Sequence, residues 1–264
     1  MRNKIVIITG SSSGLGKAIA KEMANAGAKV VLNGRNEKKL IDTYNEFLNQ
    51  NFEVIAVSGD VSNPNDCEKI IQTTLEHYKQ IDVLINNAGV SMQGTLEEVN
   101  IDVFKKVIDV NYLGSVFMTK AALKLLKETK GSILFVSSVA GLGGIPNFSA
   151  YSASKMALTA LTESLNIELN DAGVHVGIVY LGFVKNDPNK VIFNSDGQII
   201  PQPNRGVFNA IDSEVVALKI RQIIEKRAFK VVFSPVGKIY NLLHKISPSL
   251  LLFIIRRLYK KHKK

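Results

Sequence analysis

The sequence contains one cysteine, Cys67, and only four histidines, scattered along its 264 residues. A single cysteine cannot form a disulfide within the chain, and this content offers no cluster with the spacing of a metal site. No secretory signal or transit pattern precedes the first apolar run, which begins at Ile5. We therefore expect no metal ion and a place in the reducing cytoplasm.

Acidic residues are absent from 226–264, although this segment holds eleven of the chain's 33 Lys and Arg. The net charge of +10 therefore comes from this C-terminal tail, and the rest of the chain is nearly neutral. An enzyme acting on nucleic acid usually carries positive charge over a face of its folded domain. We expect no nucleic-acid partner, and a local partner for the tail.

The tail also lacks a long hydrophobic run. Its apolar stretch 250–255 has six residues, against about twenty needed for a bilayer-spanning helix. Ser247-Pro248 before it is typical of a helix start. With a second apolar group upstream, the tail is expected to form a hairpin in a membrane interface, on the cytoplasmic face, with Tyr259 and the lysines at the headgroups. The alternative is an extension packed on a partner subunit. The upstream group is Ile239, Tyr240, Leu242, Leu243 and Ile246.

Short apolar runs alternate regularly with helix-length segments. Seven runs rich in β-branched residues, separated in this way, are typical of βαβ units and of a parallel sheet covered on both faces. We predict one α/β domain of the doubly wound Rossmann type over residues 1–235, followed by the tail 236–264. The predicted strands are Ile5–Ile8, Lys29–Leu32, Val54–Val57, Val83–Ile85, Ile133–Val136, Val174–Val179 and Lys230–Phe233.

Three glycines follow the first predicted strand, within Thr9–Gly16. They let the backbone turn sharply and approach a diphosphate, and the helix predicted at 17–26 presents its positive N-terminus to the anion. The loop does not fit the G-x-x-x-x-G-K-[ST] phosphate loop. It does fit the nucleophile elbow of serine hydrolases through Ser12, but an oxyanion loop from an earlier strand has no room before Gly10. The expected cofactor contacts here are Gly10, Ser12, Ser13, Gly14, Leu15 and Gly16.

The second predicted strand ends at Gly34-Arg35, where dinucleotide folds often place an acid. An acid there accepts hydrogen bonds from ribose hydroxyls, whereas an arginine fork can clamp a 2′-phosphate. The sequence thus favours NADP(H) over NAD(H), with a solvated loop arginine as the alternative. After the third predicted strand, the carboxylate of Asp60 could accept an adenine amino hydrogen, and Val61 beside it is a further expected cofactor contact.

Tyr151 and Lys155 are four residues apart, a spacing that places both side chains on one face of a helix. A phenol titrates near pH 10, so Tyr151 exchanges protons well at neutral pH only if a neighbouring cation stabilises its phenolate. Lys155 is placed to do so. Ser138 ends a buried apolar run and brings a hydroxyl to the edge of the sheet. A hydroxyl beside an acidified phenol suits proton transfer to a carbonyl oxygen.

The glycine loop, Asn86-Asn-Ala-Gly89, Ser138 and Tyr151-x-x-x-Lys155 together resemble the short-chain dehydrogenase/reductase family over roughly the first 190 residues. The basic, apolar tail is similar to that of its membrane-associated members, the dehydrogenase/reductase member 7 and 11-beta-hydroxysteroid dehydrogenase group. The resemblance implies that Tyr151 is the general acid/base and that Ser138 hydrogen-bonds the reacting oxygen. Lys155 would hold the nicotinamide ribose and lower the tyrosine pKa. Further implied cofactor contacts are Asn87, Ala88 and Gly89.

Asn111 matches the asparagine that in this family supports a proton relay through water. A helix-interior polar residue bonded to backbone is the alternative. After the sixth predicted strand the chain departs from the family, because Leu181-Gly-Phe-Val-Lys-Asn186 replaces Pro-Gly and a later threonine. Gly182 and Val184 are still expected to contact the cofactor, with altered loop geometry.

Residues 185–208 are long for a connection and are interpreted as a substrate lid. Five apolar residues in this segment favour a lipophilic substrate, with ordinary packing as the alternative. They are Val191, Ile192, Phe193, Ile199 and Ile200.

The sequence therefore predicts an NADP(H)-dependent carbonyl reductase that transfers hydride between the nicotinamide and a secondary alcohol or ketone. A homodimer or homotetramer is implied by the resemblance, through the helix carrying Tyr151 and the one before it. The alternatives are a non-catalytic NADP(H)-binding membrane scaffold and a serine hydrolase using Ser12.

Overall fold

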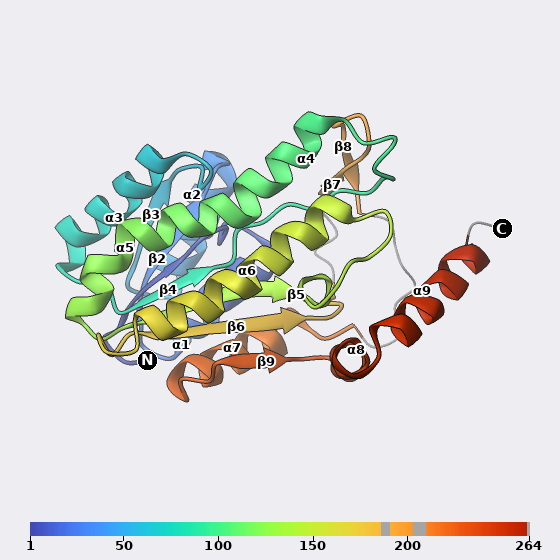
Figure 1. Cartoon of the computed structure of the whole chain (residues 1–264). Coiled ribbons are helices and arrows are strands. Elements are labelled where there is room, and N and C mark those ends of the chain that lie inside the picture. Colours follow the sequence, from blue (N-terminus) through green and yellow to red (C-terminus); the bar gives the residue numbers. More distant parts are fainter. Residues whose placement is uncertain (186–190, 203–209, 263–264) are drawn as a thin grey trace.

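A computed structural model describes residues 1–185, 191–202 and 210–262. Its centre is a seven-stranded parallel sheet in the order β3-β2-β1-β4-β5-β6-β9 (Figure 1). The strand order reverses between β1 and β4, which opens a crevice at the carboxyl ends of these strands. The predicted seven-stranded doubly wound sheet is confirmed. Its strands are β1 (Ile5–Ile8), β2 (Lys29–Gly34), β3 (Val54–Ser58), β4 (Val83–Asn86), β5 (Ser132–Ser138), β6 (His175–Leu181) and β9 (Lys230–Val232).

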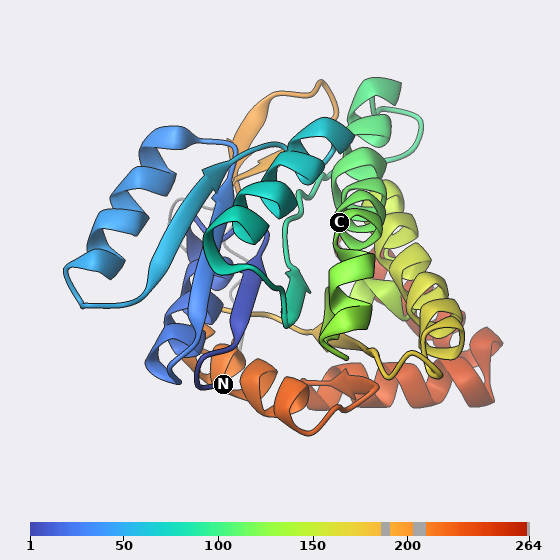
Figure 2. The ribbon, with the colours of Figure 1, turned by 90° about the vertical axis from the view of Figure 1, so that its left-hand side faces the viewer.

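Helices cover both faces of the sheet, so the strands are apolar on both sides and all four residues of β1 are buried. On one face lie α1 (Gly14–Asn25), α2 (Glu37–Leu48) and α7 (Ser213–Glu225). The other face is covered by α3 (Pro64–Tyr78), α5 (Gly114–Glu128) and α6 (Ser149–Glu168). Figure 2 shows α5 and α6 side by side. A π-helical turn, Asp109–Leu113, joins α5 to the preceding α4 (Ile101–Ile108).

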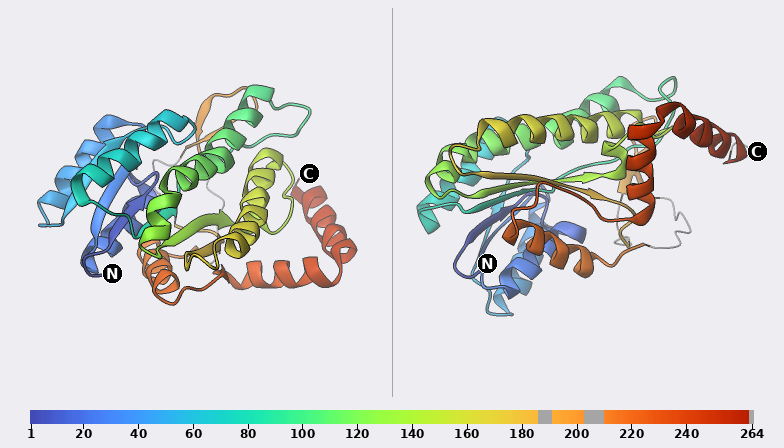
Figure 3. Two further views of the ribbon diagram at one scale, coloured as in Figure 1. Left: turned by 60° about the vertical axis from the view of Figure 1, so that its left-hand side comes forward. Right: turned by 60° about the horizontal axis from the view of Figure 1, so that its bottom comes forward.

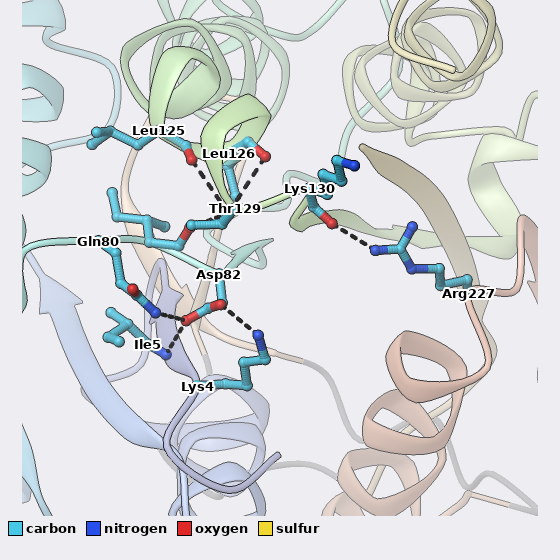
Figure 4. A network of polar contacts seen from close by, with 10 residues as sticks. Lys4, Ile5, Gln80, Asp82, Leu125, Leu126, Thr129, Lys130 and Arg227 are labelled. Carbon is cyan, nitrogen blue, oxygen red and sulfur yellow. Dashed lines mark hydrogen bonds and ion pairs between the residues drawn. The ribbon is translucent and has the colours of Figure 1, made fainter. Parts of the chain in front are cut away.

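Buried Asp82 organises the edge of the sheet where β1 and β4 begin (Figure 4). Its carboxylate accepts hydrogen bonds from the Lys4 ammonium (2.7 Å), the Ile5 backbone N–H (2.9 Å) and the Gln80 amide (3.0 Å). On the same edge, Arg227 donates to the carbonyl of Lys130 (2.6 Å). These contacts tie the first strand to the middle of the sheet at the end remote from the crevice.

Two helices form the tail, α8 (Pro235–Ile246) and α9 (Pro248–His262). They run in different directions and meet at the turn at Ser247, at the crevice end of the molecule (Figure 3). The Ser247 hydroxyl accepts from the Leu250 N–H (3.4 Å) at the start of α9. The proposed division after residue 235 falls inside the first turn of α8, whose Gly237 packs tightly on Val139.

Part of the proposed lid forms a small antiparallel hairpin of β7 (Val191–Phe193) and β8 (Ile199–Pro201), a structure that the sequence patterns did not indicate. The hairpin is attached to the loop after β4. The Phe193 N–H donates to the carbonyl of Ser91 (2.9 Å), and the Gln93 N–H donates to the carbonyl of Phe193 (2.9 Å). Asn186, Pro188, Pro203 and Phe208 lie outside the described residues.

Candidate functional site

The glycine loop lies at the crevice and connects β1 to α1. Gly10 and Gly14 have φ values of +65° and +54°, which residues other than glycine rarely adopt. At Gly16 a Cβ atom would lie 2.1 Å from the carbonyl oxygen of Gly10, so the turn closes only with glycine. No acidic residue occupies the first turn of α1, which leaves its N-terminus favourable to an anion. The loop therefore fits a diphosphate.

Thr9 joins this loop to the Asn87-Ala-Gly89 segment after β4. Its hydroxyl accepts hydrogen bonds from the N–H groups of Asn87 and Ala88, both at 3.0 Å. The Asn87 amide in turn donates to the carbonyls of Thr9 (2.9 Å) and Gly10 (3.2 Å). Thr9 was not among the predicted site residues, although a threonine directly before the first glycine was the available signal.

Asn33 is a second residue that the sequence reasoning missed. It is 1% exposed, and its amide donates to the carbonyls of Val57 and Gly59, both at 3.2 Å. Its N–H also donates to the Ser11 hydroxyl (2.9 Å). A buried amide thus holds the glycine loop and the ends of β2 and β3 together. The available signal was a polar residue ending an apolar run.

Arg35 forms an ion pair with Asp60 where β2 and β3 end, with 3.3 Å between guanidinium and carboxylate. Burial raises the pKa of the Asp60 carboxyl, but two hydrogen bonds from Ser62 and the charge of Arg35 outweigh burial, so its pKa lies below the ordinary value. Asp60 is therefore an ionised acceptor at neutral pH. Val61, beside it, is buried and packs against Gly114.

Lys155 is buried, with 5% of its surface exposed, and it lies on α6 one turn beyond Tyr151. Its ammonium donates to the carbonyl of Val136 in β5 (3.0 Å) and lies 5.9 Å from the centre of the Tyr151 ring. The same ammonium is 3.5 Å from the position that a Cβ of Gly89 would occupy. Lys155 thus meets Tyr151 and the Gly89 turn at one point.

Ser138 is the last residue of β5, two residues beyond the carbonyl that Lys155 contacts. Its hydroxyl accepts from the Ala140 N–H (3.2 Å), which holds the side chain at the start of a short 3₁₀ turn. In the sheet Ser138 pairs with Leu181 at the end of β6, so it adjoins Gly182. The predicted serine therefore stands at the crevice edge of the sheet.

Asn111 lies fully buried in the π-helical turn, a feature that often marks functional sites. Its carbonyl oxygen Oδ1 accepts from the Val90 N–H (2.7 Å), and its Nδ2 donates to the Val90 carbonyl (2.9 Å) and to the Ser154 hydroxyl (3.0 Å). Asn111 therefore fixes the turn after Gly89 against α6. The bonding to backbone matches the alternative interpretation, and Val90 and Ser154 were not predicted.

The loop after β6 pairs with the segment before α7. The Ile211 N–H donates to the Phe183 carbonyl (2.9 Å), and the Lys185 N–H donates to the Ile211 carbonyl (2.8 Å). This pairing uses neither the N–H nor the C=O of Val184, the intervening residue. Gly182 is packed so closely on Ser234 that a Cβ would lie 2.8 Å from the serine hydroxyl.

Ser12, the serine of the hydrolase alternative, lies beneath the end of β2. A Cβ on Gly34 would be 2.7 Å from its hydroxyl, and its carbonyl accepts from the Thr43 hydroxyl (3.0 Å). Within the described part of the chain, Ser12 makes no hydrogen bond to a histidine, so the pairing expected of a nucleophilic serine is not formed.

The lid hairpin packs close to Tyr151. Phe193 and Met92 are buried in a small apolar cluster against which the Tyr151 ring packs. Ile192 is also buried, whereas Val191 and Ile199 are 51% and 66% exposed. Packing therefore accounts for Ile192 and Phe193. Of the five apolar residues singled out in the lid, Val191 and Ile199 are exposed to other molecules and Ile200 is half-buried.

Comparison with known proteins agrees with this geometry. The family model described as short chain dehydrogenase matches residues 4–196. Dehydrogenase/reductase SDR family member 7B of Mus musculus is 38% identical over 75% of this chain and 62% of its own length. The 3-dehydrosphinganine reductase of Danio rerio is 41% identical over 66% of this chain and 54% of its own. The chain thus spans little more than half to three-fifths of these relatives.

Among solved structures, a short chain dehydrogenase/reductase of Burkholderia phymatum in complex with NAD is similar. It has a TM-score of 0.83 and 27% identity, and the match covers 94% of this chain and 95% of that one. The glycine loop, the Tyr151/Lys155 pair and these similarities lead to one conclusion. This chain belongs to the short-chain dehydrogenase/reductase family of oxidoreductases.

Proposed function

We propose that this protein is an NADP(H)-dependent oxidoreductase that interconverts a lipophilic ketone and its secondary alcohol, with Tyr151 as general acid/base. The observation that carries the proposal is the placement of Lys155, a buried ammonium within 5.9 Å of the Tyr151 ring and beside the Gly89 turn. A cation there favours the ionised phenol, which a proton-exchanging tyrosine needs.

The glycine loop and the N-terminus of α1 would hold the cofactor diphosphate, Asp60 the adenine, and Lys155 the nicotinamide ribose. When bound, the reduced cofactor supplies a hydride to the carbonyl carbon. Tyr151 gives its proton to the carbonyl oxygen, and the Ser138 hydroxyl donates a hydrogen bond to that oxygen. Asn111 accepts from the Val90 N–H and so holds the turn after Gly89, which lies beside the Lys155 ammonium. In the oxidation direction Tyr151 takes the proton back.

A substrate screen that follows NADPH absorbance tests the activity directly. Long-chain and polycyclic ketones are expected to be reduced, because a relative is a 3-dehydrosphinganine reductase by name and two apolar lid residues, Val191 and Ile199, are exposed. Short polar ketones of equal reactivity form the comparison. NADPH turnover with the polar series alone would contradict a lipophilic substrate.

Arg35 is proposed to select NADP(H). One of its guanidinium nitrogens contacts Asp60, and the side chain is 46% exposed, so its other donors remain available to a 2′-phosphate. Arg35→Ala is expected to weaken NADPH binding roughly ten- to a hundredfold, the effect of one charge-assisted hydrogen bond. NADH binding should change little. Titration of intrinsic or cofactor fluorescence measures both.

Lys21→Ala, an equal loss of charge on the outer side of α1, is the matched control and should leave both affinities unchanged. If Arg35→Ala weakened the two cofactors equally, Arg35 would not be the selector. The similar structure from Burkholderia phymatum is a complex with NAD, so the proposed preference for NADP(H) rests on Arg35 and not on the fold.

The tail is proposed to attach the protein to a membrane surface. Among the described helices none has the length and hydropathy of a membrane span. Instead α8 exposes one apolar face, on which Ile239 and Ile246 are 60% and 72% exposed. On α9, Phe253 and Leu258 are also exposed. These faces sit among lysines and arginines without any acidic residue, a combination that suits an anionic lipid surface.

Replacing Ile239 and Ile246 together by Gln is expected to reduce co-sedimentation with phosphatidylserine vesicles by at least about tenfold, because each buried isoleucine side chain contributes about 1.5–3 kcal/mol. The matched control is Ile41→Gln with Ile167→Gln, two isoleucines that are also exposed, by 53% and 79%, on other helices. Equal partitioning of both double variants would remove the tail from membrane binding. Truncation is a poorer test, because the Tyr240 hydroxyl lies against Gly143 in the catalytic body.

A further inference from the structure

A groove of about 490 Å³ lies between α9 and the start of α6. One side is lined by the loop 144–146 and by Ala153 and Met156 of α6, and the other side by Leu252 and Ile255 of α9. The Tyr259 hydroxyl donates to the Asn147 side chain (3.3 Å), which joins α9 to the loop at this groove. The size is that of a typical small-molecule site.

The groove lies on another face of α6 than the candidate pair Tyr151 and Lys155. The α6 residues that line it share one face of the helix; they are Ser149, Ser152, Ala153 and Met156. Since each residue advances about 100°, Tyr151 lies roughly 150° and Lys155 roughly 110° around the helix from the middle of that face. A ligand in the groove would therefore lie behind the catalytic helix.

The walls are mostly apolar, and the polar side chains in the lining are Ser149, Ser152, Arg256 and Tyr259. The Ser152 hydroxyl accepts from the Ile145 N–H (3.1 Å), and the Tyr259 hydroxyl donates to Asn147. The Ser149 hydroxyl is buried and has no hydrogen-bond partner among the described residues. Arg256 contributes a cation, and the described lining contains no Asp or Glu to neutralise it. Apolar walls with one cation and one unpaired hydroxyl are complementary to a hydrocarbon chain that ends in an anion.

We propose that this groove binds the hydrocarbon chain of an anionic, single-chain membrane amphiphile of the fatty-acid type, with its carboxylate at Arg256. The membrane is the source because the groove borders the exposed apolar residues of α9, among them Leu252, which is 52% exposed. The site does not depend on the proposed dehydrogenase activity. A second copy of the chain is the competing occupant, because α6 is the helix expected at a subunit contact.

Fluorescence of cis-parinarate, a fatty acid that brightens in apolar surroundings, tests the proposal in vesicle-free buffer with the full chain. Arg256→Gln is expected to weaken binding by roughly tenfold through the loss of one charge-assisted contact. Arg257→Gln removes the same charge from the next residue, which does not line the groove, and should have little effect. The corresponding neutral fatty alcohol, used as a competitor, should bind the two variants alike.

Ala153→Trp fills the groove from the α6 side and is expected to abolish parinarate binding while NADPH binding is retained, which shows that the variant is folded. Retained parinarate binding in this variant would overturn the proposal. So would equal losses in Arg256→Gln and Arg257→Gln, which would show a general attraction to the basic tail. A third outcome would also overturn it: the wild-type protein binds no parinarate, and Ala153→Trp has half the sedimenting mass of the wild type. The groove would then be covered by a second copy of the chain.

Discussion

Replacing Tyr151 with Phe should lower kcat by about 10²–10⁴-fold, the usual contribution of a positioned general acid. The ring remains, so its packing against Met92 and Phe193 should persist and the fold should be unchanged. NADPH affinity should remain near that of the wild type, because the glycine loop and Lys155 are untouched. Steady-state kinetics with the ketone found in the screen, together with NADPH titration, measures the two effects separately.

Tyr78→Phe is the matched control for the loss of a phenol. The Tyr78 hydroxyl is buried on α3 without a hydrogen-bond partner in the described structure, so its removal should not affect turnover. A Tyr151→Phe enzyme with near-normal kcat would rule out Tyr151 as the acid. Loss of a hydrolytic activity on Ser12→Ala, with cofactor binding retained, would instead support the hydrolase alternative.

Lys155→Met should have a different signature, because it is expected to reduce both kcat and cofactor affinity by about tenfold or more. The methionine fills the space of the lysine stem but removes the ammonium that faces Tyr151 and the Gly89 turn. The Val136 carbonyl also loses its donor. Thermal unfolding should be recorded alongside kinetics and NADPH titration, so that a loss of stability is separated from a loss of function.

Lys120→Met provides the comparison, because Lys120 is exposed on α5 and contributes the same charge. It should leave turnover, affinity and unfolding temperature unchanged. If Lys155→Met lowered kcat but left NADPH affinity intact, Lys155 would act on Tyr151 alone, and the proposed contact with the nicotinamide ribose would be wrong.

Local pattern was sufficient for the sheet and for the candidate site residues. Strands buried on both faces must be apolar throughout, so a run such as Ile5–Ile8 is recognised as a strand from its composition. The turn glycines at 10 and 14 can likewise be recognised from the sequence, because a sharp turn with positive φ favours glycine. Tyr151 and Lys155 are close in sequence, and helical geometry places them on one face.

Contacts between distant segments could not be predicted from the sequence in this way. The hydrogen bonds of Thr9 to Asn87 and Ala88 join residues about eighty positions apart in the chain, and nothing in either segment names the other. The pairing of Arg35 with Asp60 has the same character. The attachment of the lid hairpin to Ser91 is likewise a contact between distant segments. It places Phe193 in the buried apolar cluster with Met92.

The sequence by itself therefore determined the doubly wound sheet, the dinucleotide loop and the candidate acid/base pair, because each depends on backbone preferences and side-chain periods within one segment. Only the tertiary structure decided how α9 lies on α6, which side chains of the tail stay exposed, and which buried polar groups find partners. Those features depend on the order of the strands and on the packing of helices far apart in the chain, and burial is a property of the whole fold.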